Sequence, residues 1–363
     1  MTFLDKLQMR SLFGNIILII FTVLLVADIF YPATWTKLSL MKSTPLAKGD
    51  LIISPIENEI FQESGGQSQV QIITSSTAKC LVDGIKVDLD HKVTKGIGKH
   101  SLQCRSAGKE EVVPFYIGDV FILMGQSNAI GASKNTSLAP PSSPETVWYD
   151  PYKRVFRTPG TDDENVKKGI EIGGNAWTSF MNEYRLRSSK PVGIINLTRV
   201  STIDRYFQGE LFPTAGDWYY DFVVDEIQKY YQPRGIIWYH GESATIAKTD
   251  AEIYSYKLLL FIQSIRRNLR FEIPFFIINI GKNNDKSATL EVQTNWNTVK
   301  TGIRDISASM SGVYLVDDAA RYTLNCEEIS GDEDCIHLGQ DGQNKLGVSV
   351  ASKILNIVNK NIK

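Results

Sequence analysis

The chain has 363 residues, with 39 basic and 40 acidic side chains and a formal net charge of -1 at neutral pH. This balance, and the lack of a basic stripe with interleaved aromatic residues, exclude a nucleic-acid-binding protein. The length allows two folded domains in addition to a targeting or membrane segment.

The first segment is apolar. Residues 12–30 contain few polar side chains, Ile16–Ala27 carry no charge, and Lys6 and Arg10 precede the run. About 20 such residues span the hydrocarbon layer of a membrane as a helix. We therefore predict an uncleaved, single-pass membrane anchor in residues 1–33, with membrane contact through residues 12–30. A cleaved signal peptide and a buried core helix are the alternatives.

Residues 34–49 are polar, contain Pro45 and show no periodicity, which is typical of a linker. From residue 50 to residue 117 the pattern changes to short alternating runs, separated by turn-forming pairs such as Gly65-Gly66 and Asp83-Gly84. Several short strands at regular spacing predict a small, β-sandwich-like domain over residues 50–117.

The four cysteines form two sequence-local pairs, Cys80 with Cys104 and Cys326 with Cys335. Their spacing is not that of a zinc site. An even number of cysteines behind a membrane segment favours disulfides in an oxidising compartment, and four reduced, buried thiols are the alternative. We expect the globular part to lie on the extracytoplasmic (periplasmic) side of the cell membrane.

A different pattern begins at residue 118 and continues to residue 363, where apolar runs alternate with amphipathic segments. The predicted strands are Val120–Met124, Val192–Leu197, Gly235–Tyr239, Phe275–Ile280 and Gly312–Val316. The predicted helices are Ala176–Arg187, Trp218–Tyr231, Glu252–Leu269, Thr294–Met310 and Gly342–Ile362. Near-continuous apolar strands that alternate with helices predict an α/β domain built on a doubly wound parallel five-stranded sheet.

Polar residues follow these strands. Gly125-Gln126-Ser127-Asn128 follows the first strand, His240-Gly241-Glu242-Ser243 the third, and Asp334-Cys335-Ile336-His337 comes after the last. In an open parallel sheet the ligand crevice lies beyond the carboxyl ends of the strands, so we expect these residues to meet there.

Together the three segments supply the groups of a serine hydrolase. Ser127 is the candidate nucleophile, His337 the candidate base and Asp334 the group that orients the base. His240 is the other candidate base, but it has only Glu242 nearby as an orienting carboxylate. Gln126 and Asn128 are expected to fix the nucleophile loop by side-chain hydrogen bonds.

These segments resemble conserved blocks of one enzyme family. Gly125-Gln126-Ser127-Asn128 resembles the nucleophile block of SGNH hydrolases of the sialate O-acetylesterase and carbohydrate esterase family 6 type. Trp238-Tyr239-His240-Gly241-Glu242-Ser243 resembles the family's Trp-x-Gln-Gly-Glu-Ser block, and Asp334 to His337 matches its Asp-x-x-His. The resemblance implies a flavodoxin-like fold and deacetylation of an O-acetylated carbohydrate without a metal or other cofactor. It also implies that the Ser127 amide donates to the oxyanion.

The chain departs from the family pattern at two positions. His240 stands where the family has Gln, so a neutral imidazole would have to donate from Nε2. A Gly-Gly-Ser/Thr block is replaced around Arg199 to Tyr206, where only a backbone amide near Ser201 could complete the oxyanion hole. The candidate residues for oxyanion stabilisation and substrate binding are His240, Ser201, Gln126, Asn128 and Glu242.

We therefore expect a membrane-tethered, extracytoplasmic carbohydrate O-acetylesterase that acts on an acetylated polysaccharide or sialic acid. One alternative is a polysaccharide O-acetyltransferase that uses the same triad, because a sugar hydroxyl can take the place of water at the acyl-enzyme. The other alternative, from a different class, is a non-catalytic polysaccharide-binding or assembly protein.

Overall fold

The structure is a computed structural model that describes residues 51–75, 78–88, 92–150, 155–159, 174–198, 203, 227–228 and 232–361. Residues Asp50–Lys363 form one compact unit. The predicted anchor and linker, residues 1–33 and 34–49, lie outside the described residues. Within the described ranges, no helix combines the length and the apolar composition needed to cross a membrane.

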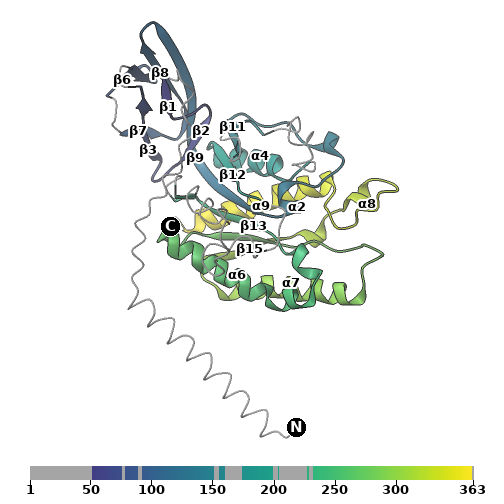
Figure 1. Cartoon of the computed structure of the whole chain (residues 1–363). Helices are drawn as coiled ribbons and strands as arrows, with labels where there is room; N and C mark the ends of the chain where they lie inside the picture. The colour runs from purple at the N-terminus through teal and green to yellow at the C-terminus, as the bar shows by residue number, and fades with distance from the viewer. Residues whose placement is uncertain are drawn as a thin grey trace, which may run out of the picture. The chain divides into compact units, whose positions relative to one another are not determined.

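A twisted sheet forms the centre of this unit (Figure 1). Over the described residues its strands lie in the order β11-β10-β12-β9-β13-β14-β15. They are β9 (Lys109–Gly125), β10 (Thr146–Asp150), β11 (Val155–Arg157), β12 (Val192–Asn196), β13 (Gly235–Tyr239), β14 (Phe275–Asn279) and β15 (Val313–Asp318). All neighbouring strands on this path are parallel, except that β11 runs antiparallel to β10.

The five predicted strands correspond to β9, β12, β13, β14 and β15. Numbered along the chain, they lie in the spatial order 2-1-3-4-5, which is the flavodoxin-like order. The prediction of a five-stranded, purely parallel sheet is wrong in one respect, because β10 and β11 extend the sheet and make it mixed. The sequence hides β10 because its apolar core is only three residues long, Val147 to Tyr149.

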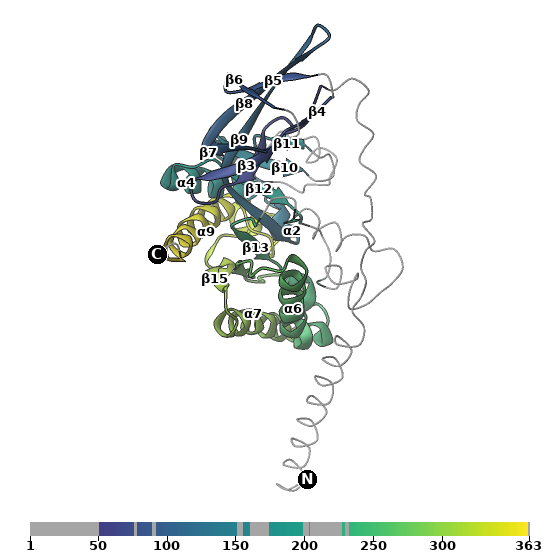
Figure 2. The same cartoon turned by 90° about the vertical axis from the view of Figure 1, so that its left-hand side faces the viewer.

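Helices cover both faces of the sheet. Helices α4 (Trp177–Ser188) and α9 (Gln340–Asn361) lie on one face, and α6 (Lys248–Leu269) and α7 (Leu290–Ser309) lie on the other (Figures 1 and 2). Alternate side chains of β9 point to opposite faces of the sheet. Phe121 and Leu123 pack with α4 and α9, and Val120, Ile122 and Met124 pack with α6 and α7. This alternation explains why the strand is continuously apolar in sequence.

The four long helices agree with the predicted ones to within four residues at their ends. Helix α7 begins earlier than predicted because the Thr289 hydroxyl accepts a hydrogen bond from the Val292 amide and caps the helix. The predicted helix Trp218–Tyr231 lies almost entirely outside the described residues. The short helices are α2 (Ser127–Ile130), α8 (Asn325–Glu328), η1 (Thr136–Leu138), η3 (Glu242–Thr245) and η4 (Ala319–Arg321).

The segment before the sheet is rich in β-structure and has its own apolar cluster, which includes Val70, Leu102 and Phe115. Its strands are β1 (Ile52–Ser54), β2 (Glu59–Gln62), β3 (Gln67–Gln71), β4 (Ile73–Thr74), β5 (Lys79–Val82), β6 (Ile85–Val87), β7 (Lys92–Gly96) and β8 (Gly98–Ser106). β8 pairs with β5 and with the first half of β9, and β2 pairs with β9 in parallel.

Strand β9 runs without interruption from this β-rich segment into the central sheet. The sequence indicates two separate runs, Glu111–Tyr116 and Val120–Met124, and the predicted boundary between residues 117 and 118 falls inside the strand. Gly118 keeps it continuous: a Cβ atom there would lie 2.1 Å from the carbonyl oxygen of Pro191, so a larger residue would push the neighbouring chain away.

Candidate active site

The nucleophile loop joins the end of β9 to α2. Gly125, the last residue of β9, has a φ of 147°, and a Cβ atom at this position would lie 2.1 Å from the Tyr239 carbonyl oxygen. Only glycine permits this turn against β13. The Gln126 amide then donates to the same Tyr239 carbonyl at 3.2 Å. The turn places Ser127 at the first position of α2, at the carboxyl edge of the sheet between β9 and β13, where the strand order reverses.

The loop that carries Asp334 and His337, the candidate acid and base, reaches Ser127 from a part of the chain about 210 residues away. His337 Nε2 lies 2.9 Å from Ser127 Oγ, and His337 Nδ1 lies 3.0 Å from each carboxylate oxygen of Asp334. The His337 amide also donates to Asp334 Oδ1 at 3.1 Å. The His337 and Asp334 side chains are 29% and 19% exposed, so the group is sheltered but open to a ligand.

This geometry fixes the proton on the imidazole. A carboxylate can only accept, so Nδ1 of His337 donates to Asp334 and Nε2 faces the Ser127 hydroxyl as an acceptor. Burial alone would raise the pKa of Asp334 and lower that of His337. Their mutual hydrogen bond and opposite charges outweigh burial, so the pKa of Asp334 falls well below its usual range and the pKa of His337 rises above its usual value.

The side chains of Gln126 and Asn128 make hydrogen bonds to neighbouring segments of the protein. Gln126 Oε1 accepts from the Ser243 hydroxyl at 3.1 Å. Asn128 Oδ1 accepts from the Leu338 amide at 3.0 Å, and its Nδ2 donates to Glu242 Oε1 at 3.0 Å. Both side chains are buried. Gln126 and Asn128 therefore connect the loop around Ser127 to two other segments, the one that follows β13 and the one that carries Asp334 and His337.

Glu242 lies in a buried position beside this group. Its Oε2 has no hydrogen-bond partner among the described residues. Burial raises the pKa of this carboxyl group, and the hydrogen bond from Asn128 and the charge of His337 act in the opposite direction. In return, the Glu242 charge contributes to the raised pKa of His337.

His240 is fully buried and lies between two aromatic rings, those of Trp238 at 5.1 Å and Tyr254 at 5.9 Å between centroids. The Tyr254 hydroxyl donates to the His240 carbonyl at 2.8 Å, which uses its one proton. His240 Nδ1, 3.3 Å from the same hydroxyl oxygen, must then be the donor in that contact. A neutral ring in this arrangement has an acceptor at Nε2, and donation from Nε2 requires an imidazolium.

Ser201, the remaining candidate for the oxyanion hole, and the neighbouring residues 199–200 lie outside the described residues. Asn325 is a site residue that the sequence analysis missed: its Nδ2 donates to Asp334 Oδ2 at 3.0 Å. Its position beside Cys326 was the available signal, because the disulfide predicted from Cys326 to Cys335 brings it next to Asp334.

Both predicted disulfides are present. Cys80–Cys104 joins directly opposite residues of β5 and β8, and Cys326–Cys335 joins the start of α8 to the residue after Asp334. Within the described ranges, no group of three or more His, Cys, Asp or Glu side chains is arranged to hold a metal ion.

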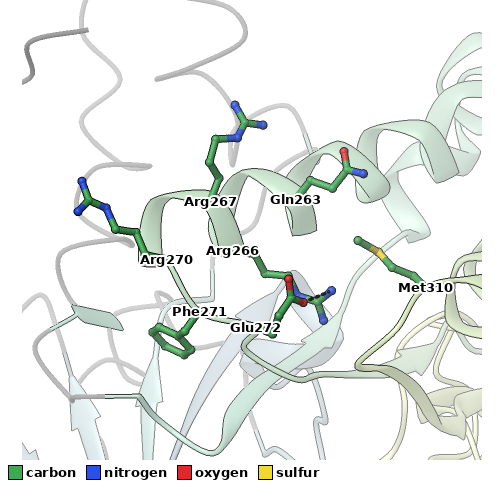
Figure 3. Close-up of a pocket in the computed structure, with 7 residues that line it drawn as sticks. All are labelled: Gln263, Arg266, Arg267, Arg270, Phe271, Glu272 and Met310. Atoms are coloured by element: carbon green, nitrogen blue, oxygen red, sulfur yellow. Dashed lines mark ion pairs between the residues drawn. The ribbon is translucent and has the colours of Figure 1, made fainter. Parts of the chain in front are cut away.

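A surface hollow of about 500 Å³ lies at the end of α6, lined by residues that come shortly before β14 and β15 (Figure 3). Its most buried cation, Arg266, pairs with Glu272 at 3.0 Å and donates to the carbonyl oxygens of Ile273 and Ser311. Figure 3 shows that Arg267 and Arg270 point away from Arg266. The Arg266 guanidinium is therefore held by groups of the scaffold, and the other two guanidinium groups of the hollow do not converge with it.

Two solved structures have a fold similar to that of this chain. A carbohydrate acetylesterase from Xanthomonas citri aligns with a TM-score of 0.59 at 16% identity, over 85% of this chain and 75% of that one. A protein from Arabidopsis thaliana aligns with a TM-score of 0.51 at 19% identity, over 66% of this chain and 98% of that one. At these identities the likeness concerns the fold.

No curated protein matches the chain by sequence. The model of the family described as carbohydrate esterase, sialic acid-specific acetylesterase, matches residues 117–356, which is well over half of the chain. The resemblance carried by the three sequence blocks is thereby confirmed, and the protein belongs to the sialic acid-specific acetylesterase family of carbohydrate esterases, enzymes that hydrolyse acetyl esters.

Proposed function

We propose that this esterase removes acetyl groups from an O-acetylated polysaccharide or sialic acid, with Ser127, His337 and Asp334 as its catalytic triad. One observation carries the proposal: the Ser127 hydroxyl, the His337 imidazole and the Asp334 carboxylate form one continuous hydrogen-bonded row. Such a row activates a serine for attack on an ester.

The steps follow from this row. As Ser127 Oγ bonds to the acetyl carbonyl carbon, its proton moves to His337 Nε2, and Asp334 stabilises the resulting imidazolium. Collapse of the tetrahedral intermediate breaks the bond to the sugar oxygen, which takes the proton from His337. A water molecule then gives a proton to His337 and attacks the acyl-enzyme, which releases acetate and restores the Ser127 hydroxyl.

The negative charge that develops on the acetyl carbonyl oxygen must be stabilised by hydrogen-bond donors. We assign the Ser127 amide to this role, because the first amides of a helix have no intrahelical acceptor. A backbone amide near Ser201 is the second candidate. His240 lies buried in the segment after β13, and in the tautomer described above its Nε2 is an acceptor, so we do not assign it as an oxyanion donor.

The proposal is tested with Ser127→Ala and His337→Ala, measured as acetate release from acetylated oligosaccharides and from O-acetylated sialic acid. Each variant should lose activity by at least about 10³-fold, because the nucleophile or its base is gone. Ser309→Ala, an exposed serine near the end of α7, is the matched control and should hydrolyse at the wild-type rate. Wild-type rates in Ser127→Ala would refute the triad. An added sugar acceptor that becomes acetylated would favour the transferase alternative.

We also propose the cellular arrangement and the division of the chain. Residues 12–30 would tether the enzyme to the cell membrane, residues 34–49 would act as a linker, and residues 50–117 would form a small β-rich domain beside the catalytic domain of residues 118–363. The two disulfides support an oxidising, extracytoplasmic location. Membrane fractionation of the full chain and of a chain that lacks residues 1–33 tests the tether, since only the full chain should sediment with membranes.

A further inference from the structure

Asn325 contacts three groups in two segments of the site through one carboxamide. It is the first residue of α8 and is fully buried. Its Nδ2 donates to Asp334 Oδ2 at 3.0 Å and to the Ala132 carbonyl at 2.9 Å, and its Oδ1 accepts from the Lys134 amide at 3.2 Å. Both of its side-chain hydrogens and its oxygen therefore have partners.

The partners require an amide at this position. Two of them, the Asp334 carboxylate and the Ala132 carbonyl, can only accept, and the third, the Lys134 amide, can only donate. An ionised Asp would place a negative oxygen against both acceptors, and Leu or Ala would remove the side-chain hydrogen bond that each of the three groups receives or gives here. The match assigns the orientation of the Asn325 amide without ambiguity.

These contacts join the two halves of the proposed triad. Ala132 and Lys134 follow α2, which carries Ser127, and Asp334 belongs to the segment that carries His337. The backbone amide of Asn325 also donates to the His337 carbonyl at 2.9 Å. Asp334 Oδ2 thus has two donors, Asn325 Nδ2 on one side and His337 Nδ1 on the other, and the plane of its carboxylate is fixed.

We infer that Asn325 is a positioning residue, which holds the Asp334 carboxylate at the angle and in the charge state needed to orient His337 towards Ser127. The inference rests on the proposed triad. Asn325 acts through Asp334 and does not contact the substrate. The Asn325 hydrogen bond is also among the interactions that lower the pKa of Asp334, in agreement with this role.

The test compares Asn325→Ala and Asn325→Asp with Asn279→Ala. Asn279 is an equally buried asparagine that donates to the Lys300 carbonyl and accepts from the Ile280 amide, so it matches Asn325 in burial but contacts no triad residue. Hydrolysis of p-nitrophenyl acetate is measured from pH 5 to pH 9, with melting temperature as the folding control.

Asn325→Ala should lower kcat by about 10- to 100-fold with little change in KM, because a hydrogen bond to a charged group is lost. In Asn325→Asp two carboxyl groups about 3 Å apart repel each other when both are ionised, so one of them holds a proton up to a raised pKa. Above the acid limb set by His337, this variant should keep activity while the two groups share that proton and lose it as the pH rises further, which adds a descending alkaline limb that the wild type lacks.

Wild-type kcat and pH profile in both Asn325 variants would overturn the inference. So would losses that only follow the melting temperature, as expected for Asn279→Ala. Failure of the proposed function gives a different result, because Ser127→Ala would then remain active whatever happens at residue 325.

Discussion

Asp334 and His337 each hold the other in its charged form, and we expect this coupling to set the pH range of activity if the proposed triad is correct. Burial acts against both charges, and the hydrogen bond between the two residues overcomes it. The base must be neutral to accept the Ser127 proton. Because the pKa of His337 is raised, activity should decline below a pH that is higher than the ordinary histidine value of about 6.5.

Asp334→Asn tests this coupling directly. Removal of the carboxylate lowers the pKa of His337, so the acid limb of kcat/KM should move to lower pH. The plateau should fall by about 10⁴-fold, because an Asn amide at this position stabilises the wrong imidazole tautomer. The measurement is kcat/KM for p-nitrophenyl acetate against pH. An acid limb that stays at the wild-type pH would mean that another group, such as Glu242, controls His337.

At this scale the residues of the proposed triad could be predicted from the sequence, whereas the hydrogen bonds of the side chains around them could not. Ser127 and the Asp334–His337 pair carry recognisable local patterns, a turn after a buried strand and an acid three residues before an imidazole. Gln126 and Asn128 were predicted at the site. Their hydrogen bonds to Ser243, Leu338 and Glu242 join segments that are far apart in the sequence, so no local pattern indicates them. Asn325 was missed although it precedes Cys326, whose predicted bridge to Cys335 places it beside Asp334.

At the scale of elements, the nucleophile depends on how closely β9 approaches β13. Gly125 has a positive φ and its Cα lies against the Tyr239 carbonyl. Gly125→Ala would combine backbone strain with a steric clash, so we expect a loss of roughly 1–3 kcal/mol in the free energy of unfolding. A 1 Å displacement of Ser127 would reduce kcat by about 100-fold.

Gly108→Ala provides the matched control for Gly125→Ala. Gly108 also has a positive φ, of 80°, but nothing lies within 4 Å of the added methyl group. It should lose stability through backbone strain alone and retain the wild-type kcat. Urea unfolding and esterase kinetics separate the two effects, and equal kcat values in the two variants would show that the close approach does not position Ser127.

The two disulfides offer a second comparison between elements. A chain-entropy argument gives roughly 3 kcal/mol of stability for either bridge, since their sequence separations of 9 and 24 residues differ little on a logarithmic scale. Only Cys326–Cys335 borders Asp334. The double variant Cys326→Ser/Cys335→Ser should therefore lower kcat as well as stability.

Cys80→Ser/Cys104→Ser is the control for this prediction, because it opens a bridge between β5 and β8, away from Ser127. It should lower the unfolding midpoint in urea and leave the kcat of the folded protein unchanged. The same kcat in both double variants would mean that the hydrogen bonds from Asn325 and Cys326 to the segment of Asp334 and His337 suffice to hold it.

Strands that are buried on both faces of the sheet could be predicted from the sequence. The continuous apolar runs predicted β12, β13 and β14 almost residue by residue, and they predicted β15, in which Leu315 is exposed, to within two residues. The mixed edge of the sheet was not predicted, because β10 contains only three apolar residues and β11 is a three-residue strand. The continuity of β9 was also missed, since Gly118 suggests a break until its contact with Pro191 is known.

At the scale of the whole described molecule, a buried ion network ties the β-rich segment to the central sheet. Arg234, which precedes β13, pairs with Glu63 after β2 and with Asp119 in β9. Lys190 lies 2.6 Å from Glu63, and the Tyr184 hydroxyl donates to Asp119 at 3.0 Å. The side chains of Glu63 and Asp119 are 4% and 2% exposed, so neither charge is solvated by water.

Arg234→Ala should therefore destabilise the protein strongly, because it leaves two buried carboxylates with too little compensating charge. Breaking a buried pair in this way costs about 3–5 kcal/mol. Arg185→Ala is the control: it breaks the half-exposed pair of Arg185 and Glu145, which contributes at most about 1 kcal/mol. Urea unfolding, followed by fluorescence and by esterase activity, measures both. Arg234 lies at the sheet edge opposite Ser127, so the folded variant should keep its kcat. A loss no larger than that of Arg185→Ala would show that the β-rich segment is held by the continuity of β9 alone.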